Sequence, residues 1–408
     1  MQIAKKPLLK IDAFPGEEGK GIRLAARGAL APLAGPVMDR INKIFADEKP
    51  ISSGPDRFIF STWIPPAPSL AFDRMLSAQI GALARRPVPD QFSIAVMRAC
   101  PNDCIHCSAP SRQGEILESD LVKSAISQAL EMGSYLITFD GGEPMLRKDL
   151  PELVASVGDR AIATSFTSGY HLTAERARDL KQAGLYAVRI SIDSPDEKEH
   201  DRIRGRVGAF RDALSGVKNA LAAGLLVDLF MVTSPHNIDQ LEEAFSLATR
   251  LGAHELSLYE IVAVGRWASH ENEVLSDGDV ARLESFHKSK NRSDGPRVTA
   301  LPYLLGPEMF GCFAGRRWIH VDGAGEALPC AYMPLSFGNI RETGLQEIWK
   351  KMTAYPWFKG RCSCQMRDRG FRDAHGEILG EAMATTQTSP TNGHHRDTER
   401  TENAQRRK

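Results

Sequence analysis

Short apolar segments alternate with amphipathic segments from about residue 90 to about residue 290. Apolar runs rich in Val, Ile and Phe predict buried strands, and apolar residues repeated every three or four positions predict helices. Strands are predicted at 92–97, 135–139, 161–166, 186–192, 226–232 and 255–262. Helices are predicted at 119–132, 148–157, 173–183, 209–223, 238–251 and 278–290. The pattern is therefore a strand-then-helix unit that repeats along the chain.

Strands that alternate with helices predict an α/β fold with a parallel sheet and its helices on the outside. Right-handed connections wind such units toward a barrel, so we expect a partial, TIM-like (β/α)6 barrel over residues 90–270. In such barrels the loops after the C-terminal ends of the strands carry the chemistry. Three motifs stand directly after predicted strands: the cysteines at 100–107, Gly-Gly-Glu at 141–143 and Thr-Ser-Gly at 167–169. We expect a site there.

Residues 1–89, which precede these units, are predicted to form an N-terminal extension. Between residues 21 and 45 the apolar residues recur at roughly helical spacing. Pro32 and Pro36 interrupt that spacing, so a broken helix is expected. A further helix is expected after Ser69, which is a favourable N-cap residue.

The chain changes character again after the repeated units. Residues 271–300 are predicted to be a linker region around one helix, and residues 301–375 a separate small module. In that module Asp322-Gly-Ala-Gly325 predicts a hairpin turn, and 345–352 predicts a short amphipathic helix. Residues 376–408 are polar and poor in large apolar residues, so this tail is predicted to be disordered.

Composition narrows the class of protein. The 408 residues include 51 Lys+Arg and 51 Asp+Glu, so the net charge of zero offers no basic field for nucleic acid. The N-terminus carries no apolar run typical of a signal peptide, and no apolar run reaches the roughly 18 residues of a membrane span. We therefore expect a cytoplasmic protein that binds neither nucleic acid nor a membrane.

Seven cysteines are the strongest chemical feature of the sequence. Disulfides are disfavoured in the cytoplasm, so clustered cysteines predict metal binding. Cys100, Cys104 and Cys107 have the spacing CxxxCxxC. Three thiolates can hold three irons of a four-iron cluster and leave the fourth iron open. Structural zinc sites have four ligands, and His106 is expected to point away because it is adjacent to Cys107.

The CxxxCxxC loop after the first strand, followed by Gly141-Gly142-Glu143-Pro144 after the second, resembles the radical S-adenosylmethionine (radical SAM) superfamily over about residues 90–270. The resemblance implies an enzyme that binds S-adenosylmethionine at the open iron of a [4Fe-4S] cluster. It implies reductive cleavage to a 5′-deoxyadenosyl radical, which abstracts hydrogen from a substrate. It also implies that Gly141 and Gly142 let the backbone approach the cofactor closely, and that Glu143 binds its ammonium group.

Other positions resemble family segments that contact the cofactor. Ser191 and Asp193 share one face of the fourth strand, because side chains alternate along a strand. Arg204 resembles the family's arginine near the cofactor carboxylate, and His106 takes a position near the adenine that is usually aromatic. Ser168 stands in Thr-Ser-Gly, where many members have Thr-Asn-Gly. We expect these side chains to contribute to the cofactor site.

The remaining cysteines, Cys312, Cys330, Cys362 and Cys364, accompany the predicted hairpin and short helix. This arrangement resembles the auxiliary-cluster modules of the superfamily, called SPASM in the long form and twitch in the short form. Four cysteines suffice for one second [4Fe-4S] cluster, which favours the short form. The CxC spacing of Cys362 and Cys364 leaves open whether both bind it. A zinc knuckle is the alternative for this group.

The sequence identifies neither a catalytic residue nor the substrate. Related enzymes modify peptides or proteins, or mature cofactors such as hemes, and both classes stay open. A reductant such as a ferredoxin or flavodoxin is implied. Asp140, Tyr259 and Glu260 are candidates to face the substrate. The rival hypothesis is a non-catalytic β/α-barrel protein whose cysteines hold zinc for structure or partner binding.

Overall fold

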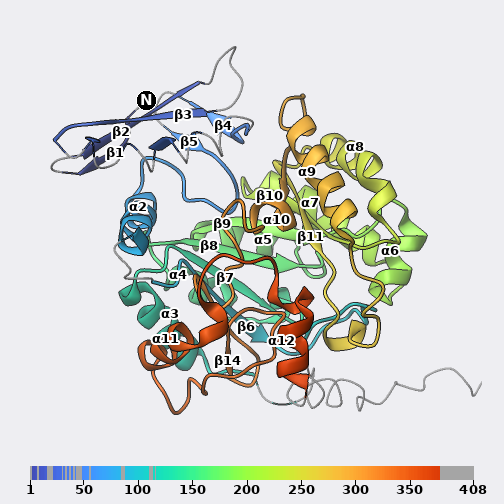
Figure 1. Ribbon diagram of the computed structural model, residues 1–408. Coiled ribbons are helices and arrows are strands. Elements are labelled where there is room, and N and C mark those ends of the chain that lie inside the picture. The colour runs from blue at the N-terminus through green and yellow to red at the C-terminus, as the bar shows by residue number, and fades with distance from the viewer. Residues whose placement is uncertain are drawn as a thin grey trace, which may run out of the picture.

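The computed structural model describes residues 2–6, 9–15, 22–29, 48–54, 57–83, 88–109 and 116–376, with Gly114 and single positions between 31 and 42. Most of this chain forms a mixed α/β architecture around one large sheet (Figure 1). Among these residues no helix is both long and apolar enough to cross a membrane. The predicted tail lies outside the described residues, apart from Gly376.

The central sheet is mainly parallel, as the repeated units predict. Its order is β12-β11-β10-β9-β8-β7-β6-β13-β14. The strands from the repeated units are β6 (Gln91–Met97), β7 (Leu136–Gly141), β8 (Ile162–Thr167), β9 (Leu185–Ser191), β10 (Leu226–Thr233) and β11 (Glu255–Glu260). Each pairs in parallel with the next, which confirms the partial barrel.

The helices that connect these strands lie around the outside of the sheet (Figure 1). They are α3 (Ser119–Met132), α4 (Leu150–Ala155), α5 (Ala174–Gln182), α6 (Glu197–Arg204), α7 (Ala209–Ala222), α8 (Leu241–Leu251) and α9 (Asp277–Lys290). Short 3-10 turns occur at Pro144–Leu146, Ile238–Gln240, Gly265–Trp267, Pro356–Phe358 and Gln365–Arg367. Helix α6 is absent from the predicted elements, because its sequence Glu-Lys-Glu-His-Asp-Arg-Ile-Arg is almost entirely polar.

Two strands beyond the repeated units extend the sheet at its edges. Residues 271–300 contain β12 (Arg297–Ala300) as well as α9, and β12 pairs in parallel with β11. At the other edge, β13 (Trp318–Val321) pairs in parallel with β6, and β14 (Ala327–Leu328) completes the predicted hairpin. The C-terminal module is therefore joined to the barrel through the sheet itself.

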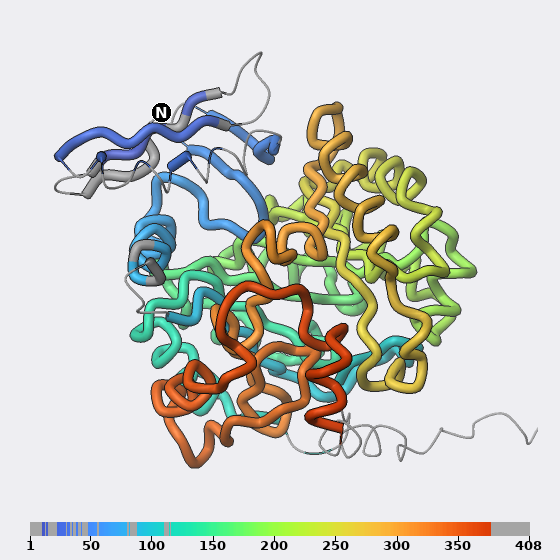
Figure 2. The backbone as a smooth tube through the Cα atoms, in the orientation of Figure 1, coloured from blue at the N-terminus to red at the C-terminus, as the bar shows by residue number. Residues whose placement is uncertain are grey.

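The rest of the C-terminal module packs on the barrel. It contains α10 (Leu301–Leu304), α11 (Leu345–Ala354) and α12 (Arg369–Ala374). Helix α11 contacts α3, and Figure 2 shows the orange and red end of the chain beside that blue-green segment. Buried residues of β13 and α11 belong to the same hydrophobic core as the barrel strands. Barrel and module therefore share one core.

The N-terminal extension forms sheets of its own. Strands β1 (Gln2–Lys6), β2 (Leu9–Pro15) and β3 (Ile22–Arg27) are antiparallel, and β4 (Ser52–Ser53) pairs with β5 (Phe58–Ile59). The expectation of helix at the start of 21–45 is therefore wrong. Ile22, Leu24 and Ala26 alternate with Arg23 and Ala25, and this period of two is that of a strand. The helix after Ser69 is confirmed as α2 (Leu70–Leu83), with the Ser69 hydroxyl accepting from the Phe72 N–H at 3.0 Å.

A row of four buried charges crosses the barrel near the beginning of its strands. Arg189, Asp228, Glu255 and Arg297 are neighbours in register on β9, β10, β11 and β12. All four side chains are buried. A charge in such a position is costly unless it is paired and hydrogen-bonded. Arg189 pairs with Asp228 at 3.5 Å and Arg297 with Glu255 at 3.3 Å, and the remaining polar atoms of these side chains need further partners.

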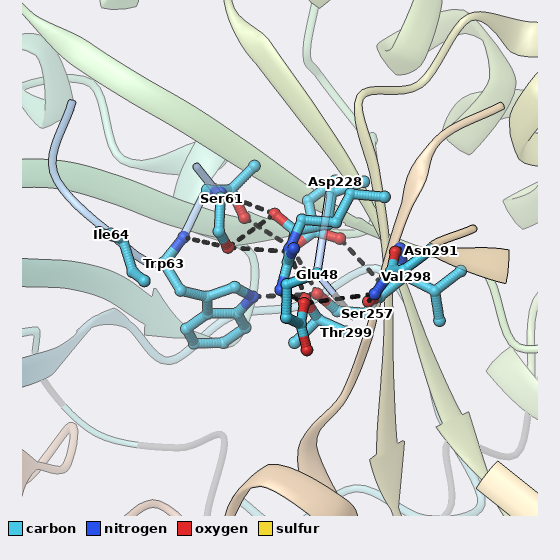
Figure 3. A network of polar contacts seen from close by, with 12 residues as sticks. Glu48, Ser61, Trp63, Ile64, Asp228, Ser257, Asn291, Val298 and Thr299 are labelled. Atoms are coloured by element: carbon cyan, nitrogen blue, oxygen red, sulfur yellow. Dashed lines mark hydrogen bonds and ion pairs between the residues drawn. The ribbon is translucent and has the colours of Figure 1, made fainter. Parts of the chain in front are cut away.

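The N-terminal extension supplies those partners (Figure 3). The Thr62 backbone N–H donates to Glu255 at 2.6 Å, its hydroxyl donates to Asp228 at 3.0 Å, and its carbonyl accepts from Arg189 at 2.9 Å. The indole of Trp63 lies 3.6 Å from the Arg189 guanidinium. The extension therefore packs where these buried charges lie in the barrel and is an integral part of the fold.

Candidate active site

A cavity of about 970 Å³ lies within the barrel and is open to both cysteine groups. Its lining includes the predicted residues Cys100, Cys104, His106, Cys107, Gly141, Gly142, Glu143, Ser168, Ser191, Arg204, Cys312, Cys330 and Cys364. These residues come from strand ends and loops that are far apart in the sequence. The structure thus brings most of the predicted site residues together around one space.

The cysteine loop, residues 98–108, follows β6 and docks on the last turn of α6. The Asp103 N–H donates to the Arg204 carbonyl at 2.8 Å, and the Ile105 N–H donates to the Ile203 carbonyl at 3.0 Å. The last carbonyls of a helix have no partner within the helix, so the loop satisfies them. Gly205 ends α6 with a φ of 64°, and a Cβ there would clash with the Asp103 carbonyl. Helix α6 therefore fixes the position of the three cysteines.

Gly141 and Gly142 hold the other side of the cysteine loop. The Gly142 N–H donates to the Met97 carbonyl at 2.6 Å. A Cβ on Gly142 would clash with the Ala99 carbonyl, and a Cβ on Gly141 would clash with Met97. The close approach that these glycines allow in this structure is to the cysteine loop itself. Their predicted contact with a cofactor stays a prediction.

Glu143 is fully engaged by neighbouring donors. One carboxylate oxygen accepts from the Thr167 hydroxyl at 2.7 Å and the Met145 N–H at 3.1 Å. The other accepts from the N–H of Ser168 at 2.8 Å and from its hydroxyl. Burial raises the pKa of Glu143, although these hydrogen bonds oppose the rise. Glu143 thus joins the turn after β7 to the end of β8, and Ser168 and the unpredicted Thr167 act through it.

Asp193 follows β9 and is held between two predicted cofactor residues. Its Oδ2 lies 2.8 Å from Arg204 Nη2 and 3.6 Å from His106 Nε2, and its Oδ1 accepts from the Val232 N–H at 3.1 Å. Burial alone would raise the pKa of Asp193, but the Arg204 guanidinium, two histidines and the Val232 N–H together outweigh it and the pKa is lowered. Arg204 also lies 3.7 Å from Cys104 Sγ. A cation is therefore fixed beside the thiols, where anionic thiolates need one.

The second cysteine group is Cys312, Cys330, Cys362 and Cys364. The Cys312 N–H donates to the Cys362 carbonyl at 2.8 Å, and Cys362 Sγ accepts from Gln365 at 3.5 Å. Burial raises the pKa of Cys330 to about 12. A thiol in such apolar surroundings stays protonated unless a metal takes the thiolate, because burial disfavours the charged form. The donor set thus fits a metal centre better than a reactive free thiol.

Single metal ions have no ready site in the residues described. Within that part of the chain, no three side chains of His, Cys, Asp or Glu lie close enough together to hold one ion. An iron-sulfur cluster is held by thiolates on separate irons. The three thiols beside Arg204 and the four thiols of the second group are donor sets of that kind.

Aromatic and acidic residues also form part of the cavity wall. The Tyr259 ring stacks on Tyr332 with centroids 4.9 Å apart and on Phe230 at 5.9 Å. Burial raises the pKa of Glu260 to about 7, and Arg367 lies 3.4 Å from it. Asp140 also lines the cavity. The three residues expected to face the substrate, Asp140, Tyr259 and Glu260, therefore do face this space.

Comparison with known families and curated proteins agrees with this geometry. The family model described as the radical SAM superfamily matches residues 94–248, and the iron-sulfur cluster-binding SPASM domain matches residues 312–371. The chain is 28% identical over 292 residues to the AdoMet-dependent heme synthase of Nitratidesulfovibrio vulgaris, covering 65% of this chain and 79% of that one. It is 26% identical over 314 residues to the enzyme of the same name from Methanosarcina barkeri, covering 69% and 89%.

The fold of this chain is also similar to that of several solved structures. Streptococcus suis SuiB bound to the precursor peptide SuiA superposes with a TM-score of 0.56 at 15% identity, covering 72% of this chain and 71% of that one. The structure of anSMEcpe with bound AdoMet and the Cp18Cys peptide gives a TM-score of 0.53 at 16% identity, covering 72% and 97%. At this identity the likeness establishes the fold alone.

Proposed function

Because the chain belongs to the radical SAM superfamily and carries a SPASM domain, we propose that Cys100, Cys104 and Cys107 hold the [4Fe-4S] cluster that binds S-adenosylmethionine. When bound, this pair supplies a 5′-deoxyadenosyl radical by reductive cleavage. The observation that carries the proposal is that residues of both cysteine groups and the Gly-Gly-Glu turn line the same cavity. The enzyme abstracts hydrogen from a substrate in that cavity.

The surrounding residues position the cluster and the cofactor. Arg204 balances the negative charge of the thiolates, and Asp193 holds Arg204 in place at 2.8 Å. Glu143 fixes the glycine turn and Ser168, so their backbone groups are presented to the cofactor in one arrangement. Ser191 and His106 line the same space. Groups held in this way cost little reorganisation when the cofactor binds.

We propose that Cys312, Cys330, Cys362 and Cys364 hold a second [4Fe-4S] cluster. A cluster with four protein ligands has no open iron for the substrate. Held by these four cysteines, such a cluster would supply a one-electron acceptor or relay after hydrogen abstraction, or it would stabilise the module. The stacked Tyr259 and Tyr332 line the same cavity as this group, and Tyr332 is two residues after Cys330.

For the substrate we propose a tetrapyrrole heme precursor that carries carboxylate groups. The names of the curated relatives support this class. The volume of about 970 Å³ is at the upper end of small-molecule sites. Stacked aromatic side chains suit a flat macrocycle. Arg98 and Arg367 line the cavity and are suited to carboxylates.

A peptide substrate is the second candidate, and one observation favours it. The lining of the cavity continues beyond the barrel to the N-terminal extension, where Leu24, Phe60 and Phe72 take part. A macrocycle held at the cluster would leave this part unfilled, whereas an extended peptide would reach it. The peptides named in the similar structures are consistent with this reading.

We also propose the cytoplasm as the compartment, with a low-potential ferredoxin or flavodoxin as reductant. All seven cysteines are free of disulfides, which suits a reducing compartment. We propose residues 90–270 as the barrel unit and 301–375 as the auxiliary module, with β13 of the module paired to β6 of the barrel.

The proposal is tested with protein purified and reconstituted without oxygen. We expect about eight iron atoms per chain for two four-iron clusters, and 5′-deoxyadenosine on addition of dithionite and S-adenosylmethionine. A carboxylated iron porphyrin and a synthetic peptide are then compared as substrates by mass spectrometry. A mass change of the porphyrin supports the first class, and a change of the peptide supports the second. Zinc in place of iron, with no 5′-deoxyadenosine, would support the non-catalytic alternative.

A further inference from the structure

Asp140 and His320 lie on the two strands that flank β6. Asp140 on β7 is in register with Ala95, and His320 on β13 is in register with Ser93. Ser93 and Ala95 are two residues apart, so they share one face of β6. Asp140 and His320 meet over that face, with Oδ2 3.7 Å from Nδ1, and both line the cavity. The barrel and the C-terminal module thus contribute one residue each.

Burial and a contact with Ser93 define the state of His320. Ser93 Oγ lies 2.8 Å from His320 Nδ1 and accepts from the Trp318 indole N–H at 2.8 Å. An indole N–H only donates, so Ser93 Oγ accepts from Trp318 and also contacts His320 Nδ1. Burial lowers the pKa of His320 to about 3. The imidazole is therefore neutral and fixed.

The second carboxylate oxygen of Asp140, Oδ1, is buried and has no hydrogen-bond donor among the described residues. The titratable groups that face it are His320 from β13 and Tyr332 from the loop after β14, and both are uncharged near neutral pH. With no cation to oppose burial, the pKa of Asp140 is raised to about 8. A buried acceptor without a partner is costly, and here it faces the substrate space.

We propose that Asp140, positioned by His320, is the proton acceptor of the substrate oxidation. This inference rests on the proposed function. The 5′-deoxyadenosyl radical takes one hydrogen atom from a substrate carbon. The substrate radical then passes one electron to the oxidised auxiliary iron-sulfur cluster and releases one proton from an adjacent C–H or heteroatom–H bond to the Asp140 carboxylate. The substrate loses two hydrogens and gains one bond, and the electrons balance.

The proposal is tested with Asp140→Asn, the conservative Asp140→Glu, and Asp159→Asn as a matched surface control. Asp159 is exposed and lies outside the site. Infrared difference spectra of the reconstituted enzyme, without substrate, follow carboxyl ionisation between pH 6 and pH 10. We expect a carboxyl that ionises near pH 8 in the wild type and in Asp159→Asn and is missing in Asp140→Asn. Its presence in Asp140→Asn would overturn the assignment.

Turnover gives the second readout. With the carboxylated iron porphyrin, product formed per 5′-deoxyadenosine is measured against pH. Loss of a general base costs about 10²–10⁴-fold, so Asp140→Asn lowers this ratio at least a hundredfold and Asp140→Glu restores part of it. The wild-type ratio rises with pH up to about 8, and the Asp140→Asn ratio is flat. A wild-type ratio and pH profile in Asp140→Asn would refute the inference. Absence of 5′-deoxyadenosine in the wild type would instead refute the proposed function.

Discussion

Glu48→Gln removes the charge that the N-terminal extension places among the buried groups of Figure 3. Glu48 is 2% exposed. One oxygen contacts the Arg297 guanidinium, and the other contacts His287. Burial opposes ionisation of Glu48, but Arg297 and His287 outweigh it and lower its pKa. The substitution keeps the shape and leaves the Arg297 charge with less compensation.

The magnitude follows from the partners that remain. Removing one partner of a buried ion pair costs about 3–5 kcal/mol. Arg297 keeps the Glu255 carboxylate at 3.3 Å, so we expect the lower end, about 3 kcal/mol. At about 2–4 °C per kcal/mol this lowers the melting temperature by about 6–12 °C. A loss of about 3 kcal/mol is a large part of the free energy of unfolding of a native protein, which is typically about 5–15 kcal/mol.

Circular dichroism during heating and in urea measures this loss at pH 7. Glu342→Gln is the matched control, because Glu342 is exposed on the C-terminal module. We expect the control to melt within about 1 °C of the wild type, as surface substitutions usually do. If Glu48→Gln melted together with the control, the extension would not be an integral part of the barrel.

Three further predictions concern the site. Cys330→Ala is expected to keep 5′-deoxyadenosine formation and lose product by mass spectrometry; full product would make the second cluster dispensable. Thr167→Val removes a hydrogen-bond donor to buried Glu143. It is expected to lower the free energy of unfolding by about 1–3 kcal/mol and to raise the KM for S-adenosylmethionine. Thr167→Ser, which keeps the hydroxyl, is expected to change neither. The folded-state pKa of His320, about 3, lies below the unfolded value of about 6.5. Its contribution to stability is therefore present above pH 6.5 and lost as pH falls toward 3. In a plot of urea midpoint against pH, the slope on the acid side is therefore expected to be shallower for His320→Asn than for the wild type. Equal slopes would contradict a neutral, buried His320.

The repeated units and the two cysteine groups could be predicted from the sequence because their patterns are local. The periodicity of apolar residues in 92–251 predicts the strands and helices of the parallel sheet. The motifs directly after the strand ends predict where the site lies. Helix α6 could not be predicted, since its polar sequence has no apolar face, and its stability comes from caps and the docked cysteine loop. Asp196 caps it by accepting from the Glu199 N–H.

Long-range pairings account for the other differences. The sequence predicts the hairpin at 322–325, but nothing local shows that β13 joins β6 in parallel. The same pairing brings His320 close to Asp140, so the contact between these two residues could not be predicted from the sequence. Short β12 lies in a polar linker and becomes a strand because β11 offers an open edge. Thr167 is part of the Thr-Ser-Gly motif but was not predicted as a site residue. Its hydroxyl group beside a strand end is the sequence feature that could have identified it as one.

We propose that one cluster in this chain has an open iron that binds S-adenosylmethionine. The most direct measurement of this binding is the electron paramagnetic resonance spectrum of the reduced, reconstituted enzyme with and without S-adenosylmethionine. We expect the cofactor to change the signal of one cluster, the change to be lost in Cys104→Ala, and the signal of the second cluster to stay. A spectrum that S-adenosylmethionine leaves unchanged would contradict an open iron.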